Sequence, residues 1–439
     1  MIKNTHVSIV SIKEKIYLVI FLVMSIVYAF FSSPSPNQIG LYEILIALCL
    51  TAIVGFKGVF FTLGYQAETN RNIHVLAIIS FLFLVVVPTI TGLIVLENEI
   101  SNYIRDIVPM LYLILPIFIF HRVKINPSEW MRGVVFSICV IGLAYSIRQI
   151  IESNILISDI GSKGSFITQN YFILDPAVFF TATFLTCYSA VLFLQSYFLK
   201  GLSLAVLAMA PWFIILAAVS RSAITLILIA LLAIIFLTIA RSKTTKLSSF
   251  KTMIPFVAIL VFMSPELVTL FSKIWIILLE KYENVGVNGR LFEIQYVVEN
   301  IDNIRTLLFG EGWGGLVDSP LFSHSVRFTH NSFSYFLFKS GVIGLMAFIV
   351  YLYFLFSKMF SGDVLNKKSA IILPVQAAII VTLIIHFLLE AGFKSLTIGM
   401  VLTLMMLLGM KNNRNSTKSS LIRDYRCIYD DKKRILSKA

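Results

Sequence analysis

The sequence predicts an all-α, polytopic membrane protein. Of its 439 residues, 58% are hydrophobic and only 13% are charged, and the mean hydropathy is +0.89. A soluble globular domain has roughly one quarter charged residues. Apolar runs of roughly 20 residues, long enough to cross a bilayer as helices, recur along the whole chain. A membrane barrel would instead show alternating segments of about ten residues.

The apolar runs predict about twelve membrane-spanning helices. They lie near residues 16–31, 40–56, 73–96, 104–120, 131–150, 172–198, 202–219, 222–240, 252–271, 332–357, 370–389 and 395–410. The first run lacks a small-x-small cleavage site, so we expect an uncleaved helix rather than a signal peptide. The stretch 202–240 is too long for one span, and Ser220-Arg221-Ser222 predicts a tight turn within it.

The basic residues predict the orientation of these helices. With the N-terminus in the cytoplasm, most of the 36 Lys and Arg residues fall on the cytoplasmic side, as the positive-inside rule requires. The net charge of +13 therefore does not indicate a nucleic-acid partner. Both termini are expected in the cytoplasm, whereas Arg221 and the loop 272–330 are expected on the outer side.

Four segments follow from this layout. Residues 1–271 hold nine helices, 272–330 form a large outer loop, 331–410 hold three more helices, and 411–439 are a basic tail near anionic lipid. The loop is expected to carry short amphipathic helices lying on the membrane. No internal repeat is apparent, which weighs against transporter folds built from duplicated halves.

A glycine-rich segment, Gly310–Gly315, stands in this outer loop. It is not a phosphate-binding P-loop, because no Gly-Lys-Ser/Thr follows. We expect a flexible, tight reversal of the chain, with Trp313 in the membrane interface or stacked on a sugar.

Metal and cofactor sites are not predicted. The four cysteines show neither a disulfide framework nor metal spacing. Glu97, Glu99 and Asp106 are compatible with an oxygen-liganded divalent ion, but a solvated loop is the preferred interpretation. Farther along, His386, Glu390 and Lys394 are spaced for one helix face, where they either line a cavity or, as we prefer, pair with one another.

Two arginines are candidates for binding an anion. Arg221 stands at a membrane boundary, where a guanidinium is costly unless it faces water, a partner or a phosphate. The alternative is a snorkelling side chain that fixes the helix ends. Arg290 alone would be an ordinary loop residue, but with Arg221 it forms a pair of planar forks matched to a diphosphate.

His330 is the candidate base. It precedes Asn331 at the predicted start of a helix, where free N–H groups favour an anion. A neutral histidine there can accept the proton of a hydroxyl nucleophile. The alternative is a histidine that only caps the helix.

The order of these motifs resembles the O-antigen ligase/polymerase (Wzy-type) superfamily. The matching motifs are Ser220-Arg221-Ser222, Gly289-Arg290, Phe309-Gly310-Glu311-Gly312, His330-Asn331 and Gly341-x-x-Gly344. The resemblance covers about 220–345 by motif and the remainder by topology only. Asp175-Pro176 is weakly similar to another segment of the family. Lys339 departs from the family pattern, in which an acidic residue is common before this glycine.

The resemblance implies a metal-independent glycosyltransferase of the GT-C type in the bacterial inner membrane. Its donor would be an oligosaccharide on undecaprenyl diphosphate, presented at the periplasmic face, and a chain-length regulator protein would be a partner. Arg221 and Arg290 would bind the diphosphate and His330 would activate the acceptor hydroxyl. Asn331, Trp313, Gly310 and Gly312 would contact the substrate.

Three other functions remain open at this stage. A polymerase is preferred over a ligase that moves the glycan to lipid A–core, although both share these motifs. A flippase for lipid-linked oligosaccharides should line a central path with charges, whereas the predicted spans are almost free of charge. A non-catalytic scaffold would leave Arg221 and His330 unexplained.

Overall fold

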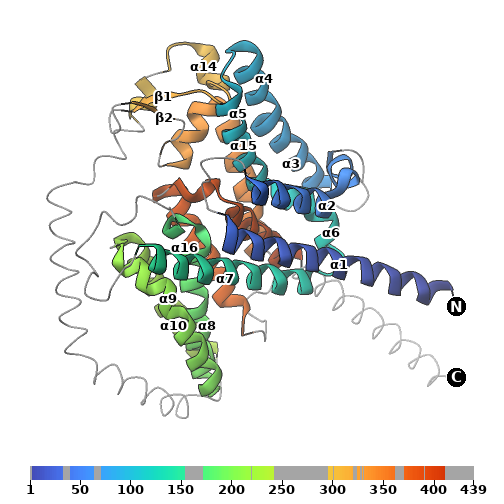
Figure 1. Cartoon of the computed structure of the whole chain (residues 1–439), viewed down its shortest axis with the longest axis vertical. Coiled ribbons are helices and arrows are strands. Elements are labelled where there is room, and N and C mark those ends of the chain that lie inside the picture. The colour runs from blue at the N-terminus through green and yellow to red at the C-terminus, as the bar shows by residue number, and fades with distance from the viewer. Residues whose placement is uncertain are drawn as a thin grey trace, which may run out of the picture.

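The computed structural model shows a helical, multi-pass membrane protein (Figure 1). It describes residues 2–32, 40–63, 71–153, 172–218, 220–241, 295–299, 301–319, 324–326, 329, 331–360, 370–389 and 391–410. Within these ranges, nine helices are long and apolar enough to cross a membrane. Each coincides with one of the predicted spans.

Five of the nine are single helices in the structure, and a sixth, α15, is broken at Gly341. They are α1 (Ile2–Phe31), α7 (Pro127–Glu152), α8 (Pro176–Leu194), α9 (Phe198–Ala217), α10 (Arg221–Arg241) and α15 (Ser332–Phe360). The other three are composite. They join α3 (Arg71–Phe81), η1 (Leu82–Val86), α4 (Val87–Ile90) and η2 (Thr91–Val95); α5 (Ile100–Leu113) and α6 (Leu115–Val123); and α16 (Ile372–Ile384) and η7 (Ile385–Leu389).

The remaining predicted spans are less clear-cut. Residues 40–56 and 395–410 correspond to two shorter apolar helices, Leu41–Gly55 within α2 (Leu41–Leu63) and Leu396–Met410. The predicted span 252–271 lies outside the described residues.

The outer loop contains the short helix α14 (Ile304–Phe309) and a hairpin of β1 (Val317–Ser319) and β2 (His324–Val326). We did not predict the hairpin, because its strands are only three residues long.

Helix α8 is the centre of the lower half of the molecule in Figure 1. It has no charged residue, so it can be enclosed by protein, and α7, α9, α10 and α16 pack around it. Phe179 and Phe180 in its first turns are fully buried. The upper part of the molecule in Figure 1 holds α3–α5, α14 and the hairpin, against the first half of α15.

The end of α1, the start of α8, the start of α15 and the turn η7 that follows α16 meet at one end of this bundle. The Tyr28 hydroxyl of α1 lies 3.4 Å from the Asp175 carboxylate that precedes α8. The Ser332 hydroxyl at the start of α15 donates to the Phe387 carbonyl at the end of α16, over 2.7 Å. His386 packs edge-on against Phe179, with ring centroids 5.1 Å apart. The up-and-down alternation predicted from the basic residues therefore agrees with the packing, while the side that faces the cytoplasm remains a prediction.

The chain between the last two helices corrects one prediction. Residues 385–389 form a π-helical turn and η8 (Ala391–Lys394) is a 3₁₀ helix, so the α-helical spacing of four no longer holds. His386 is fully buried against Phe179, whereas the Lys394 ammonium lies 4.5 Å from the centroid of the Tyr335 ring. The prediction that His386 and Lys394 share one helix face is therefore wrong, whereas a pairing with Glu390 stays a prediction. Glu390 lies outside the described residues.

Candidate functional site

The predicted turn at Arg221 is present. Helix α9 ends at Ala217, α10 begins at Arg221, and the Ser220 amide donates to the Ile215 carbonyl over 3.2 Å. Ala218 in this turn packs with Leu174, just before α8. The arginine therefore begins its helix at the same end of the bundle as Asp175. Arg290 and His330 lie outside the described residues, so their roles stay predictions.

Asn331 caps the start of α15. Its side-chain oxygen accepts the Phe333 amide over 2.8 Å, and its carbonyl accepts the Thr329 hydroxyl over 2.9 Å. These contacts satisfy polar groups that a helix start otherwise leaves without a partner. The predicted contact of Asn331 with substrate is not tested by this geometry.

The segment Gly310–Gly315 is a packed loop rather than a flexible turn. The Glu311 amide donates to the Phe338 carbonyl over 2.8 Å, and the Gly312 amide to the Lys339 carbonyl over 3.0 Å. The Trp313 amide donates to the Pro88 carbonyl over 3.0 Å. A backbone bonded to both α15 and α4 has little freedom to move.

Glycine is required in this loop for two physical reasons. Gly310, Gly312 and Gly314 have φ values of 73°, 71° and 89°, which L side chains rarely adopt. A Cβ on Gly312 would also collide with the backbone of Gly92, and one on Gly92 with the backbone of Trp313. Close backbone packing therefore explains these glycines, and the contact of Gly310 and Gly312 with substrate stays a prediction.

The indole of Trp313 lies in the protein core. The residue is 0% exposed, and its ring centroid is 6.1 Å from that of Tyr335. The prediction of a ring in the membrane interface is therefore wrong, because glycine at position 92 makes room for the loop to enter between the helices. The indole nitrogen has no hydrogen-bond partner among the described residues.

An ion pair that the sequence did not reveal lies beside this loop. Lys339 of α15 and Asp106 of α5 are 0% and 1% exposed, and the ammonium is 2.5 Å from the carboxylate. Asp106 also accepts the Gly314 amide over 2.9 Å and the Tyr335 hydroxyl over 3.3 Å. Asp106 is therefore neither in a solvated loop nor in an acidic group with Glu99, whose carboxylate instead accepts hydrogen bonds from Ser101 and Asn102.

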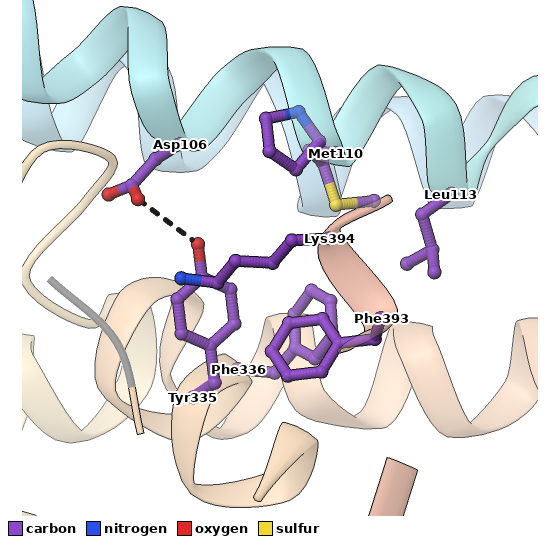
Figure 2. Close-up of a pocket in the computed structure, with 8 residues that line it drawn as sticks. Asp106, Met110, Leu113, Tyr335, Phe336, Phe393 and Lys394 are labelled. Carbon is purple, nitrogen blue, oxygen red and sulfur yellow. Dashed lines mark hydrogen bonds between the residues drawn. The ribbon is translucent and has the colours of Figure 1, made fainter. Parts of the chain in front are cut away.

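A small pocket opens next to the ion pair (Figure 2). Its wall is mainly apolar and comes from three elements. The lining residues are Asp106, Pro109, Met110 and Leu113 of α5, Tyr335 and Phe336 of α15, and Phe393 and Lys394 of η8. Its empty space is about 210 Å³ including the open mouth. Lys394, the Tyr335 hydroxyl and the Asp106 carboxylate form the polar end of an otherwise apolar pocket.

A second buried carboxyl group lies at Asp175. It caps α8 through the Ala177 amide, 2.7 Å away, and is 0% exposed. Burial raises the pKa of this carboxyl to about 6, although the Ala177 amide and the hydroxyls of Thr397, Ser395 and Tyr28 act in the opposite direction. The sequence offered only a weak signal here, the dipeptide Asp175-Pro176.

This environment predicts a pH-dependent stability. Because its pKa is raised, the folded state holds the Asp175 proton more tightly than the unfolded state does, whose pKa is about 3.9. The free energy of unfolding should therefore fall by up to about 3 kcal/mol as the pH rises from about 4 to about 6. Thermal midpoints at the two ends of this range should differ less in Asp175→Asn than in the wild type. Exposed Asp302→Asn is the control and should keep the wild-type difference.

Comparison of the chain with protein-family models, with curated proteins and with solved structures finds no match in any of the three.

Proposed function

We propose that the chain is a glycosyltransferase that polymerises oligosaccharide repeat units carried on undecaprenyl diphosphate, at the periplasmic face of the bacterial inner membrane. Arg221 and Arg290 bind the diphosphate of the donor. His330 accepts the proton of the acceptor hydroxyl as that hydroxyl attacks the anomeric carbon. The diphosphate-linked lipid leaves with the electrons of the broken glycosidic bond.

One observation supports this proposal above the others. The Arg221 turn, the Asn331 cap of α15 and the pocket at Lys394 all belong to helix ends that gather at one end of the bundle. The turn that carries Arg221 and the helix start next to His330 thus come from segments far apart in the sequence. A lipid-linked anion that stays at one depth in the membrane is the substrate class that fits this distribution.

The chemistry requires little beyond these groups. A diphosphate is a good leaving group once its charge is neutralised, and arginine forks do this well in a partly desolvated site. A base on the acceptor then completes the reaction. The proposal therefore includes no metal ion and no cofactor.

The packing gives less support to a carrier. The described spans contain buried charges, but these are paired: Asp106 with Lys339, and Glu14 with Arg122 over 3.7 Å. Each pair joins neighbouring helices, and we find no file of charges along a path among the described residues. A carrier for a charged lipid headgroup would need such a path.

Reconstitution tests the proposal directly. The purified protein is placed in liposomes with undecaprenyl-diphosphate-linked repeat units and no other acceptor, and the products are separated on a gel. A ladder of lengthening glycans is expected. Transfer that occurs only after lipid A–core is added would instead identify a ligase, and the absence of product with both acceptors would favour a carrier.

Chelation should leave the activity unchanged. The same assay with excess EDTA is expected to give the wild-type ladder, because the arginines replace a metal ion at the diphosphate. Inhibition that added Mg²⁺ reverses would contradict this expectation and would direct attention to Glu97 and Glu99. A matched variant, Glu99→Gln, would then show whether that carboxylate holds the ion.

A further inference from the structure

The buried pair of Asp106 and Lys339 does more than join two helices. Both side chains also bond to the glycine-rich loop between them. The Lys339 ammonium donates to the Gly315 carbonyl over 2.5 Å, and the Asp106 carboxylate accepts the Gly314 amide over 2.9 Å. Two consecutive residues of the loop, Gly314 and Gly315, are thus each held by one ion of the pair.

The energetics indicate a geometric purpose. Moving two charges out of water costs several kcal/mol for each ion, and an apolar pair of similar volume often stabilises a protein equally well. Most of the described side chains around this site are apolar or aromatic, such as Met110, Phe336 and Phe338. Only charged or strongly polar groups can bond to an amide and a carbonyl of the loop at the same time, so the pair is suited to fixing the loop.

The loop in turn fixes the first part of α15. Gly341 has a φ of 65° and breaks this helix, which leaves residues 332–340 as a short separate segment. Within it, the Phe338 and Lys339 carbonyls accept the amides of Glu311 and Gly312. A helical segment bounded by a break needs such contacts to keep one direction, because the helical backbone geometry is interrupted at Gly341.

We propose that Asp106 and Lys339 are positioning residues that orient the segment Ser332–Ser340, and with it the start of α15. His330 comes two residues before this segment in the chain, so the pair acts on the proposed reaction through the placement of that helix start. Neither residue touches substrate in this scheme. The inference rests on the proposed function for its catalytic consequence, but the clamp itself can be tested without any activity.

Hydrogen exchange of the full-length protein in detergent measures the clamp. Peptides that contain residues 311–314 should exchange at least about ten-fold faster in Lys339→Met and Asp106→Asn than in the wild type, because one partner of a buried pair is lost. Peptides from α8 should exchange as in the wild type, which shows that the fold is intact. Glu152→Gln is the control, because it removes the half-exposed partner of Arg148, 3.4 Å away, and should change nothing in the loop.

A charge swap separates the ion pair from its bonds to the loop. Asp106→Lys combined with Lys339→Asp should leave exchange in the loop at least about ten-fold faster than in the wild type, because the ammonium at position 106 cannot accept the Gly314 amide and the carboxylate at position 339 cannot donate to the Gly315 carbonyl. In the polymerisation assay, the single variants should lower kcat with little change in KM, and the swap should not recover kcat.

Two results would overturn the inference. Unchanged loop exchange in both single variants would show that the pair does not hold the loop. Wild-type exchange in the swap would show that the ion pair alone, and not its bonds to Gly314 and Gly315, keeps the loop in place. Failure of the proposed function looks different: the exchange results would be as expected, but no glycan ladder would form in the wild type.

Discussion

His330→Ala, Arg221→Ala and Arg290→Ala are each expected to abolish polymer formation while the protein still inserts and folds. Loss of a general base lowers a rate by about 10² to 10⁴. Loss of one charged group that stabilises a developing anion costs about 10² to 10³. Single-round transfer by equal amounts of folded protein in liposomes measures these effects, and size-exclusion profiles confirm insertion.

The chain offers matched controls for these variants. Arg305 is exposed on α14, so alanine at this position should leave turnover within about two-fold, as expected for a surface change. Arg221→Lys keeps the charge but loses the planar fork, and it should recover only part of the rate. Wild-type turnover in any of the three alanine variants would remove that residue from the proposed mechanism.

Gly312→Ala is expected to cause the largest structural defect of any single methyl group added to the outer loop. The residue has a φ of 71°, and a Cβ there would collide with the Gly92 backbone, which cannot give way as a flexible side chain can. Strain of this kind together with the clash should cost more than about 3 kcal/mol locally. A lower thermal midpoint in detergent and fast hydrogen exchange at Glu311 and Trp313 would show that the loop has left its position.

Gly315→Ala tests whether this defect depends on geometry. In Gly315 the added Cβ would lie 3.0 Å from the Cβ and 3.1 Å from the carbonyl oxygen of Glu311, which a shift of a few tenths of an ångström relieves, and no positive φ is involved. We expect a change of less than about 1 kcal/mol. Equal stability of Gly312→Ala and the wild type would mean that the loop is not docked as the structure has it.

Most of the membrane-spanning helices could be predicted from the sequence, because the signal for each of them is local. A helix needs about 20 apolar residues to cross a lipid bilayer, so each span can be recognised from one continuous apolar segment of the sequence, such as that of α8. The turn at Arg221 could also be predicted from a local segment, because residues 202–240 are too many for a single membrane-spanning helix. The helix break at Gly341 could not be predicted from the local sequence. It depends on a contact with Leu308 and Phe309, whose backbone atoms lie where a Cβ of residue 341 would be.

The candidate site was harder to predict because its contacts are distant in sequence. Asp106 and Lys339 are 233 residues apart, and neither has a local signal that names the other. The only local signal at Lys339 is its departure from the pattern of the family that the sequence resembles. Trp313 was assigned to the interface from the usual preference of tryptophan in membrane proteins, whereas its position depends on the missing side chain at Gly92. The predictions for Arg290 and His330 concern residues beyond those described and stay predictions.

The contact between Asp106 and the outer loop also has a consequence for biogenesis. Asp106 enters the membrane with α5, but the groups that neutralise it, Gly314 and Lys339, are 208 and 233 residues farther along the chain. During synthesis this carboxylate has neither partner until several later spans have been inserted. Formation of its contacts with Gly314 and Lys339 is therefore a late step of assembly. A chain truncated before Lys339 would retain an unpaired acidic group among apolar helices. Such a chain should be recognised by membrane quality control, whereas the completed protein conceals the same group.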